Sequence, residues 1–177
     1  MDKNSILNRQ HCVLHNLSKL PKKIIERHSH EQLHEFILHE IACEGCFDLS
    51  KVIFLIDNPE FNILKGIAGV ARTEAFSNGD SIWTDIDRFT IHMKGAAFND
   101  KAKKHNGLSH KKNNIATEPA FKEIAHSFDM ADSSLCSLEL KHGNHGYLLY
   151  EKMNPKDNSC DEYIEHALSL LGFCPIH

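Results

Sequence analysis

The sequence predicts an α+β fold, a single domain over residues 1–177 in which a mostly antiparallel sheet of about four strands is packed by N-terminal, central and C-terminal helices. Residues 1–45 follow helical spacing, whereas residues 46–177 mix short strand-like runs with helical segments. Residues 134–153 indicate two strands around a glycine-containing turn, and such a hairpin joins antiparallel strands. With 177 residues and 41% apolar content, the chain can form its own core. We expect helices on one face of the sheet.

Helical segments are expected before the first strand. Residues 6–17 form a first amphipathic segment, and Pro21 is expected to open a second one. Ser29 has Gln32 three residues later, which is the spacing of a capping box and predicts the start of the next helix. Gly45 is expected just beyond its end, because glycine is favoured after a helix C-terminus.

The middle of the chain predicts strands and a helix in alternation. Residues 51–57 (KVIFLID) form a short apolar run rich in β-branched residues, which predicts a buried strand. Asn58 followed by Pro59 is typical of a helix start, so a helix is expected over the residues that follow. In RFTIHMK, apolar and polar residues alternate, and this alternation predicts another strand.

The last third of the chain adds a loop, a helix, the hairpin and a final helix. Residues 99–117 are polar and are expected to form a loop, and helical spacing returns at residues 120–128. The final helix is expected to begin at Ser159, because Glu162 completes a second capping box, and to end at Gly172.

Composition narrows the classes of function. The formal net charge of −4 argues against a general nucleic-acid binder, which is usually basic. The longest apolar runs, such as residues 52–56, are too short to span a membrane. The first ten residues lack the apolar core of a signal peptide, so we expect a soluble, cytoplasmic protein. In that compartment the six cysteines would be reduced thiols, which can bind a metal.

Cysteine and histidine spacing predicts a structural zinc site that joins the two ends of the chain. Cys43 and Cys46 form a C-x2-C pair, and Cys174 and His177 form a C-x2-H pair. Thiolate and imidazole ligands at these short spacings are typical of structural zinc. His39 precedes Cys43 by four residues, on the same helical stripe, and is a substitute ligand. The site requires that the fold bring both chain ends together.

Two other interpretations of these cysteines remain open. Free cysteines at a helix end can be buried simply as small apolar residues. The C-x-x-C pair could also be a redox pair, but such pairs usually lie at a helix N-terminus, where the helix dipole lowers the thiol pKa. Here the pair follows a predicted helix C-terminus, and this position disfavours redox chemistry.

The segment from His30 to His34 has the pattern H-E-x-x-H. Over these five residues it resembles the metal-binding helix of zincin-type zinc metallopeptidases. The resemblance implies that His30 and His34 bind zinc and that Glu31 acts as the general base of a hydrolase. Zinc would need a third protein ligand, which the sequence does not identify. The alternative is a pair of solvated histidines at a polar helix start.

Three aspartates are the first candidates if the protein is a metal-free binding or regulatory domain. Asp57 ends a predicted strand, and Asp85 and Asp87 would share one face if their segment is a strand. Carboxylates that gather in a cleft can bind a ligand, whereas isolated aspartates in loops are usually turn residues. The sequence leaves open whether the protein is an enzyme, and it names no substrate or partner.

Overall fold

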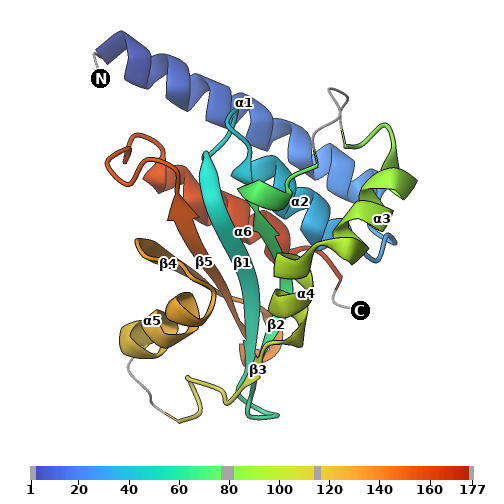
Figure 1. Cartoon of the computed structure of the whole chain (residues 1–177), viewed down its shortest axis with the longest axis vertical. Helices are drawn as coiled ribbons and strands as arrows, with labels where there is room; N and C mark the ends of the chain where they lie inside the picture. Colours follow the sequence, from blue (N-terminus) through green and yellow to red (C-terminus); the bar gives the residue numbers. More distant parts are fainter. Residues whose placement is uncertain (1–2, 77–81, 114–116, 176–177) are drawn as a thin grey trace.

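One antiparallel sheet organises the structure, a computed structural model that describes residues 3–76, 82–113 and 117–175. The strand order is β3-β2-β1-β5-β4, and all neighbouring strands are antiparallel (Figure 1). The α+β class is therefore confirmed, with five strands in the described residues instead of about four. The strands are β1 (Leu49–Asn58), β2 (Ile63–Ala71), β3 (Asn106–Gly107), β4 (Ser133–Glu139) and β5 (His145–Lys152), of which β4 and β5 form the predicted hairpin.

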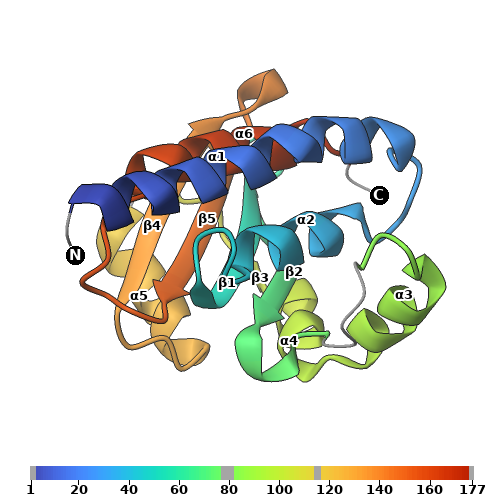
Figure 2. The same cartoon turned by 90° about the horizontal axis from the view of Figure 1, so that it is seen from above.

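Helices cover both faces of this sheet, so the expectation of a single covered face is wrong. On one face α2 packs against β1 and β2, α6 packs against β4 and β5, and α1 lies across α2 and α6 (Figures 1 and 2). On the other face α4 packs against β2 and α5 against β4. The α-helices are α1 (Lys3–Glu26), α2 (Leu33–Ala42), α3 (Ile86–Gly95), α4 (Ala97–Lys104), α5 (Thr117–Ser127) and α6 (Ile164–Gly172), and short 3-10 turns are η1 (Arg72–Glu74), η2 (Lys141–Gly143) and η3 (Asp161–Tyr163).

Strand β1 separates two apolar cores. Val52 and Phe54 belong to the core under α1, α2 and α6, whereas Ile53 and Leu55 belong to the core under α4 and α5. Successive side chains of a strand point to opposite faces, so a strand buried on both sides has a continuous apolar sequence. The predicted buried strand is thereby confirmed. Asp57 continues the alternation of Ile53 and Leu55 and points to the α4–α5 face.

A β-hairpin follows β1 where the sequence predicted a helix. Asn58 accepts a hydrogen bond at its Oδ1 from the backbone N–H of Phe61 at 3.1 Å, so Asn58 and Pro59 start a turn and not a helix. The next strand contains Gly66, where a Cβ atom would lie only 1.9 Å from the carbonyl oxygen of Ala102. Glycine at this position therefore allows α4 to lie directly on β2.

Helix α3 replaces the strand expected from RFTIHMK. Phe89 and Met93 are buried and lie four residues apart, on one face of a helix, whereas Ile91 is 73% exposed. A strand would have buried all three together. The helix begins after Asp85, whose Oδ1 accepts a hydrogen bond from the backbone N–H of Arg88 at 3.2 Å, as an N-cap residue does.

Several predicted helix boundaries also differ. Helix α1 continues through Pro21, and α2 has Gln32 at its N-cap, so Ser29 does not cap it. Part of the polar segment expected to be a loop forms α4, whereas the central helix after it is confirmed as α5. The last helix ends at Gly172 as expected, but it starts after the turn η3 and not at Ser159.

Candidate ligand-binding site

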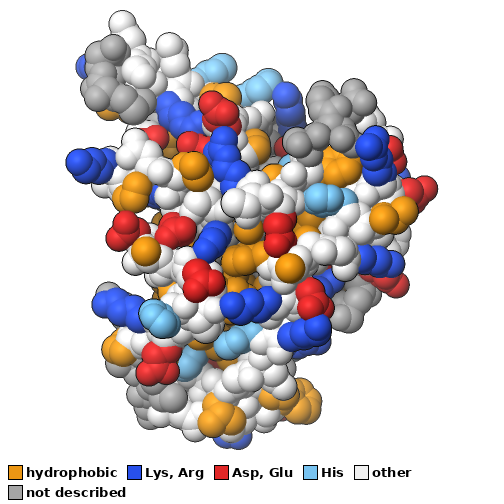
Figure 3. Space-filling model, viewed as in Figure 1, with side chains coloured by type: hydrophobic (Ala, Val, Ile, Leu, Met, Phe, Trp, Pro, Cys, Tyr) orange, Lys and Arg blue, Asp and Glu red, His pale blue; other side chains and the backbone are white. Residues whose placement is uncertain are grey.

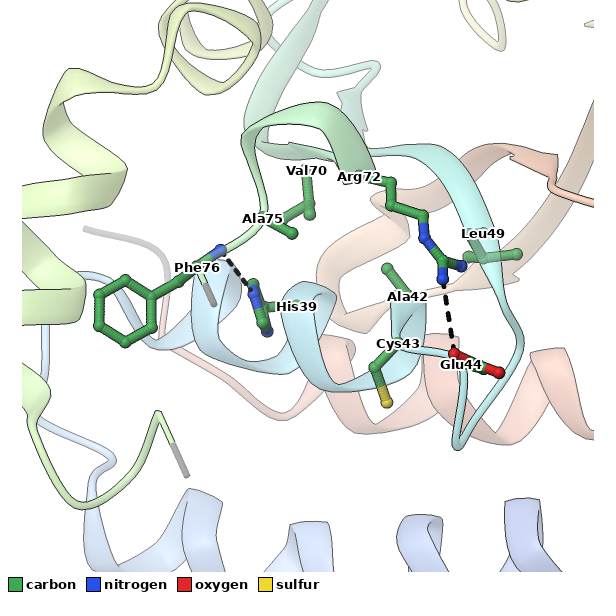
Figure 4. A pocket seen from close by; sticks show the side chains of 9 residues that line it. All are labelled: His39, Ala42, Cys43, Glu44, Leu49, Val70, Arg72, Ala75 and Phe76. Atoms are coloured by element: carbon green, nitrogen blue, oxygen red, sulfur yellow. Dashed lines mark hydrogen bonds and ion pairs between the residues drawn. The ribbon is translucent and has the colours of Figure 1, made fainter. Parts of the chain in front are cut away.

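A small pocket of about 200 Å³ lies between the C-terminal half of α2 and the end of β2 (Figure 4). Apolar side chains form much of its wall, and polar groups come from α2, the turn after α2, and η1. Two candidates from the sequence, His39 and Cys43, contribute to it. The residues that line the pocket are His39, Ala42, Cys43, Glu44, Leu49, Val70, Arg72, Ala75 and Phe76.

His39 presents a neutral imidazole to this pocket. Its Nε2 accepts a hydrogen bond from the backbone N–H of Phe76 at 3.1 Å, which assigns the ring proton to Nδ1. Burial lowers the pKa of His39, and the nearby His92 also lowers it, against the opposing effects of Glu40 and of the Phe76 backbone. The hydrogen bonds within the described residues leave the Nδ1–H donor of His39 unused.

Arg72 supplies a cation at the same pocket. Its Nη1 donates to Asp48 Oδ1, and its Nη2 lies 3.6 Å from Glu44 Oε2. The Glu44 side chain is 84% exposed, so its ion pair with Arg72 contributes little stability. A carboxylate of a ligand could therefore replace Glu44 beside the guanidinium at small cost.

Cys43 lines the pocket but does not direct its sulfur toward the charged groups. In Figure 4 its thiol points away from Arg72 and His39, and it donates to the backbone oxygen of Glu40 at 2.9 Å. Burial raises the pKa of Cys43, and the charge of Glu40 raises it further. Because the thiolate is the form that attacks substrates, these surroundings disfavour a nucleophilic role.

Cys43 and Cys46 lie next to each other after α2, with the backbone N–H of Cys46 donating to the carbonyl oxygen of Cys43 at 3.0 Å. Cys174 is buried at the end of α6, where its thiol donates to Leu170 O at 3.5 Å and burial raises its pKa to about 12. His177 lies outside the described residues. Within the described ranges, no three His, Cys, Asp or Glu side chains form a group that could hold a metal ion. Zinc binding through both chain ends stays a prediction.

The histidines of the H-E-x-x-H pattern contact different aromatic rings. His30 lies in the turn before α2, with its ring centroid 5.5 Å from that of Phe36, whereas His34 stacks on Phe54 at 5.5 Å in the core. Glu31 is exposed. Because α2 begins after His30, one helix face does not carry both imidazoles, and no geometry of the described residues supports the hydrolase prediction.

His30 instead lines an open depression together with Asp85 and Asp87. The depression measures about 390 Å³ and includes Arg27 from the turn after α1. Asp85 caps α3, and Asp87 is exposed in the first turn of this helix. Acidic residues are favoured at both positions because they compensate the positive end of the helix dipole. Helix capping thus accounts for the two aspartates, which do not share a strand face.

Asp57 is fully buried at the end of β1. Its Oδ2 accepts hydrogen bonds from the backbone N–H groups of His110 at 3.0 Å and Lys111 at 3.1 Å. Its Oδ1 is buried and has no hydrogen-bond partner among the described residues. Burial raises the pKa of the neighbouring Tyr147, and the charge of Asp57 raises it further. Asp57 therefore belongs to a polar cluster that includes no other aspartate from the sequence-based set.

Two histidines of this cluster also carry unpaired buried atoms. Nε2 of His105 and both ring nitrogens of His110 have no hydrogen-bond partner in the part of the chain that the structure describes. The His110 ring packs on Phe121 of α5, with centroids 5.0 Å apart. Burial lowers the pKa of His105, and His110 lowers it further. Buried polar atoms are nearly always hydrogen-bonded, so this cluster is a functional candidate as well.

Sequence reasoning did not select Arg72, His105 or His110 as site residues. Arg72 follows a strand that was expected to be a helix, so its position beside α2 could not be inferred. The two histidines lie in a segment that was expected to be a polar loop. The fully buried Ser109 between them distinguishes the segment from a solvated loop, and burial is not visible in the sequence.

The surface shown in Figure 3 carries acidic and basic side chains intermixed over the whole view. None of the helices in the described ranges is long and apolar enough to cross a membrane. No family model, no curated protein and no solved structure matches this chain.

Proposed function

We propose that the protein is a binding domain for a small molecule with an apolar body and one carboxylate, held in the pocket beside α2. The observation that carries this proposal is the position of the Arg72 guanidinium at the rim of a pocket whose wall includes Ala42, Leu49 and Val70. A pocket with apolar walls and a few directed polar groups is the usual form of a small-ligand site.

Arg72 would bind the carboxylate. It can form charge-assisted hydrogen bonds with it in place of the exposed Glu44, and the Nδ1–H of His39 is a further donor on the wall of the same pocket. The remaining walls would cover the apolar body. A volume of about 200 Å³ suits a ligand of the size of benzoate.

Binding is favoured over catalysis by the state of the reactive groups. The pKa of Cys43 is raised by burial, which opposes nucleophilic attack. The pKa of His39 is lowered, and its Nε2 is already engaged with Phe76, so a general acid–base role would require this contact to break. A regulatory or carrier role fits these features better than turnover.

Three ligands of one shape test the proposal: benzoate, benzyl alcohol and benzylamine. Titration should be followed by NMR, with the backbone amides of Ala75 and Phe76 as reporters of the pocket. Benzoate should bind with a Kd of about 1 mM or below, a value typical of so small a ligand, and the other two should bind more weakly. Arg72→Gln should weaken benzoate binding about tenfold, through loss of charge-assisted hydrogen bonds.

Arg27→Gln is the matched control, because Arg27 lines the other depression beside His30. It should leave the benzoate affinity unchanged. Equal affinities for the three ligands, or an Arg72→Gln variant that binds benzoate normally, would reject a carboxylate site at α2.

The cytoplasm is the compartment that this proposal assumes. All six cysteines, each within the described ranges, are free thiols, which suits a reducing environment. Structural zinc through Cys43, Cys46, Cys174 and His177 remains the second proposal. It predicts about one zinc per chain in protein purified without added metal, and a metal-free, fully stable sample would reject it.

A further inference from the structure

Residues 108–113 close over the polar end of the sheet. Asn113 Nδ2 donates to Asn62 Oδ1 in the turn after β1 at 3.0 Å, and the His110 ring packs on Phe121 of α5. Asp57 Oδ2 accepts the backbone N–H groups of His110 and Lys111 at 3.0 and 3.1 Å. Within the segment, the Oγ of the buried Ser109 accepts the backbone N–H of Lys112 at 3.1 Å. The segment is therefore fixed to β1 mainly through a single carboxylate.

A row of facing residues crosses the sheet beneath this segment. The register places Asp57 of β1 opposite His145 of β5, and His145 opposite Glu139 of β4. Paired residues in antiparallel strands point to the same face, so the imidazole stands between two carboxyl groups. Several histidine side chains are visible close together in the lower part of Figure 3, at the same end of the molecule as β3 and α5.

The second connection joins the segment to β5. Lys111 Nζ contacts His145 Nε2, while His145 Nδ1 lies 2.7 Å from the carbonyl oxygen of Asn144. A lysine ammonium has only donors, so Nε2 must be the acceptor and Nδ1 must carry the proton. This contact exists only while His145 is neutral. A second proton on the ring would remove the acceptor and place two positive charges side by side.

Several charged or titratable groups face the His145 ring. Asp57 faces His145 from β1 and Glu139 faces it from β4, whereas Lys111 faces it from the covering segment and Tyr147 lies along β5 with ring centroids 6.4 Å apart. The two carboxylates attract a positive charge on the ring, and the lysine repels it. In acid, His145 would therefore lose its contact with Lys111 in the segment and interact instead with the carboxylates of Asp57 and Glu139 in the sheet.

The histidines that flank the closure act in the same direction. His105 and His110 contain buried nitrogens with no partner among the described residues, and burial lowers the pKa of His105 in the closed form. Opening the segment would expose both rings to water. Protons therefore bind more readily to the open form, and by linkage acid favours opening.

We infer that residues 108–113 form an acid-released latch, which is closed over Asp57 while His145 is neutral and opens when His145 is protonated. The latch operates independently of the pocket beside α2. Histidine is the residue whose charge ordinarily changes between pH 5 and 8, so the closed and open forms should be compared within that range.

Hydrogen exchange of individual amides tests the latch on the full chain. The backbone N–H groups of His110 and Lys111 donate to Asp57 in the closed form and should be protected at pH 7.5. After correction for intrinsic exchange rates, their protection should fall several-fold by pH 5.5, because protons bind more readily to the open form. Amides of the central strand β1, such as that of Phe54, should keep their protection.

Two variants separate the latch from general acid effects. His145→Gln keeps an oxygen that can accept from Lys111 but cannot be protonated, so the protection of His110 and Lys111 should fall less between pH 7.5 and pH 5.5 than it does in the wild type, and the fall that remains would come from His105 and His110. His126→Gln, a change of an exposed histidine on α5, should preserve the wild-type fall in protection. Unchanged pH dependence in His145→Gln would overturn the inference.

Two lysine variants test the latch if His145→Gln does not fold. Lys111→Ala removes the partner of His145 and should reduce the protection at pH 7.5 toward the wild-type value at pH 5.5. Lys112→Ala, one residue along the same exposed segment, should leave it unchanged. Equal protection in the two lysine variants, or wild-type protection that does not vary with pH, would also overturn the latch.

Discussion

Asp57 of β1 and His145 of β5 stand opposite each other in neighbouring antiparallel strands, and the segment of residues 108–113 contacts both side chains. Each side chain takes hydrogen bonds from that segment, so the end of the sheet and its cover form one unit. Asp57 contributes as the acceptor of two backbone N–H groups, which makes it the stronger of the two attachments.

Asp57→Ala should lower the free energy of unfolding by about 2 kcal/mol, because it leaves two partly buried N–H donors without an acceptor. Urea denaturation followed by circular dichroism measures this change. Glu60→Ala removes an exposed carboxylate from the turn after β1 and should change stability by less than about 0.5 kcal/mol. Similar losses in both variants would mean that Asp57 does not hold the segment.

Gly66→Ala should be strongly destabilising, by about 3 kcal/mol, because its Cβ would lie 1.9 Å from the carbonyl oxygen of Ala102 and would force α4 away from β2. Gly95→Ala is the matched control. Gly95 ends α3, and a Cβ there meets nothing within 4 Å, so the change should be neutral or slightly stabilising. Thermal unfolding of the two variants makes the comparison, and tolerance of alanine at position 66 would contradict the close packing of α4.

Lys103→Met should cost about 2 kcal/mol of stability, because Glu35 is 1% exposed and would lose its cation. The value lies below that of a fully buried pair since the Lys103 side chain is 44% exposed. Lys104→Met removes an exposed partner of Asp100 from the same helix and should cost less than about 0.5 kcal/mol. Denaturant titration of both variants would show the difference. Equal losses in the free energy of unfolding would mean that Glu35 is in contact with solvent.

Sequence patterns correctly predicted the helices and strands that are buried either on one face only or on both faces. The run KVIFLID, the β4–β5 hairpin and the apolar stripe of α6 each have one arrangement that buries their apolar residues. RFTIHMK has two such arrangements. Phe89 and Met93 share one face of a strand, where alternate residues point the same way, and they also share one face of a helix, where they lie four residues apart. Only the exposure of Ile91 separates them, and this exposure depends on what packs against the segment.

The candidate site was less accessible to sequence reasoning, because its residues meet only through the fold. Arg72 and His39 line one pocket because β2 runs back along β1, whereas Asn58 and Pro59 indicated a helix in place of β2. Asp57 was correctly placed at a strand end, but its role as a ligand-binding residue is untested. Its neighbours come from a polar segment with no recognisable pattern.

Acid should destabilise the protein through His39. Burial lowers its pKa in the folded state, so the unfolded chain binds the proton more readily, and stability that is fully present above the ordinary value of 6.5 is lost as the pH falls below it. His39→Gln keeps an acceptor for the Phe76 N–H without a titrating group. It should reduce the loss of stability between pH 7 and pH 5 by about 1 kcal/mol, measured by urea denaturation at each pH. An unchanged pH dependence would mean that His39 is not held neutral, and His126→Gln serves as the exposed control.

Alkylation of the thiols by iodoacetamide should follow their burial. Cys12 is exposed and should react first, whereas Cys46 and Cys174 should react at least about 100-fold more slowly, because burial raises the pKa of both and only the thiolate attacks the reagent. Mass spectrometry of peptides after timed quenching gives the order. Rapid alkylation of Cys46 or Cys174 would contradict their burial.

The same experiment with a chelator distinguishes buried thiols from zinc ligands. Thiols that are protected by burial alone should react at the same rate with and without EDTA, because nothing is removed from them. Zinc held by Cys43, Cys46 and Cys174 would make all three react faster when the metal is withdrawn, since structural metal and folding are coupled. From the hydrogen bonds of Cys43 to Glu40 and of Cys174 to Leu170, we expect no effect of EDTA. A joint acceleration of the three would reverse that expectation and support the zinc bridge.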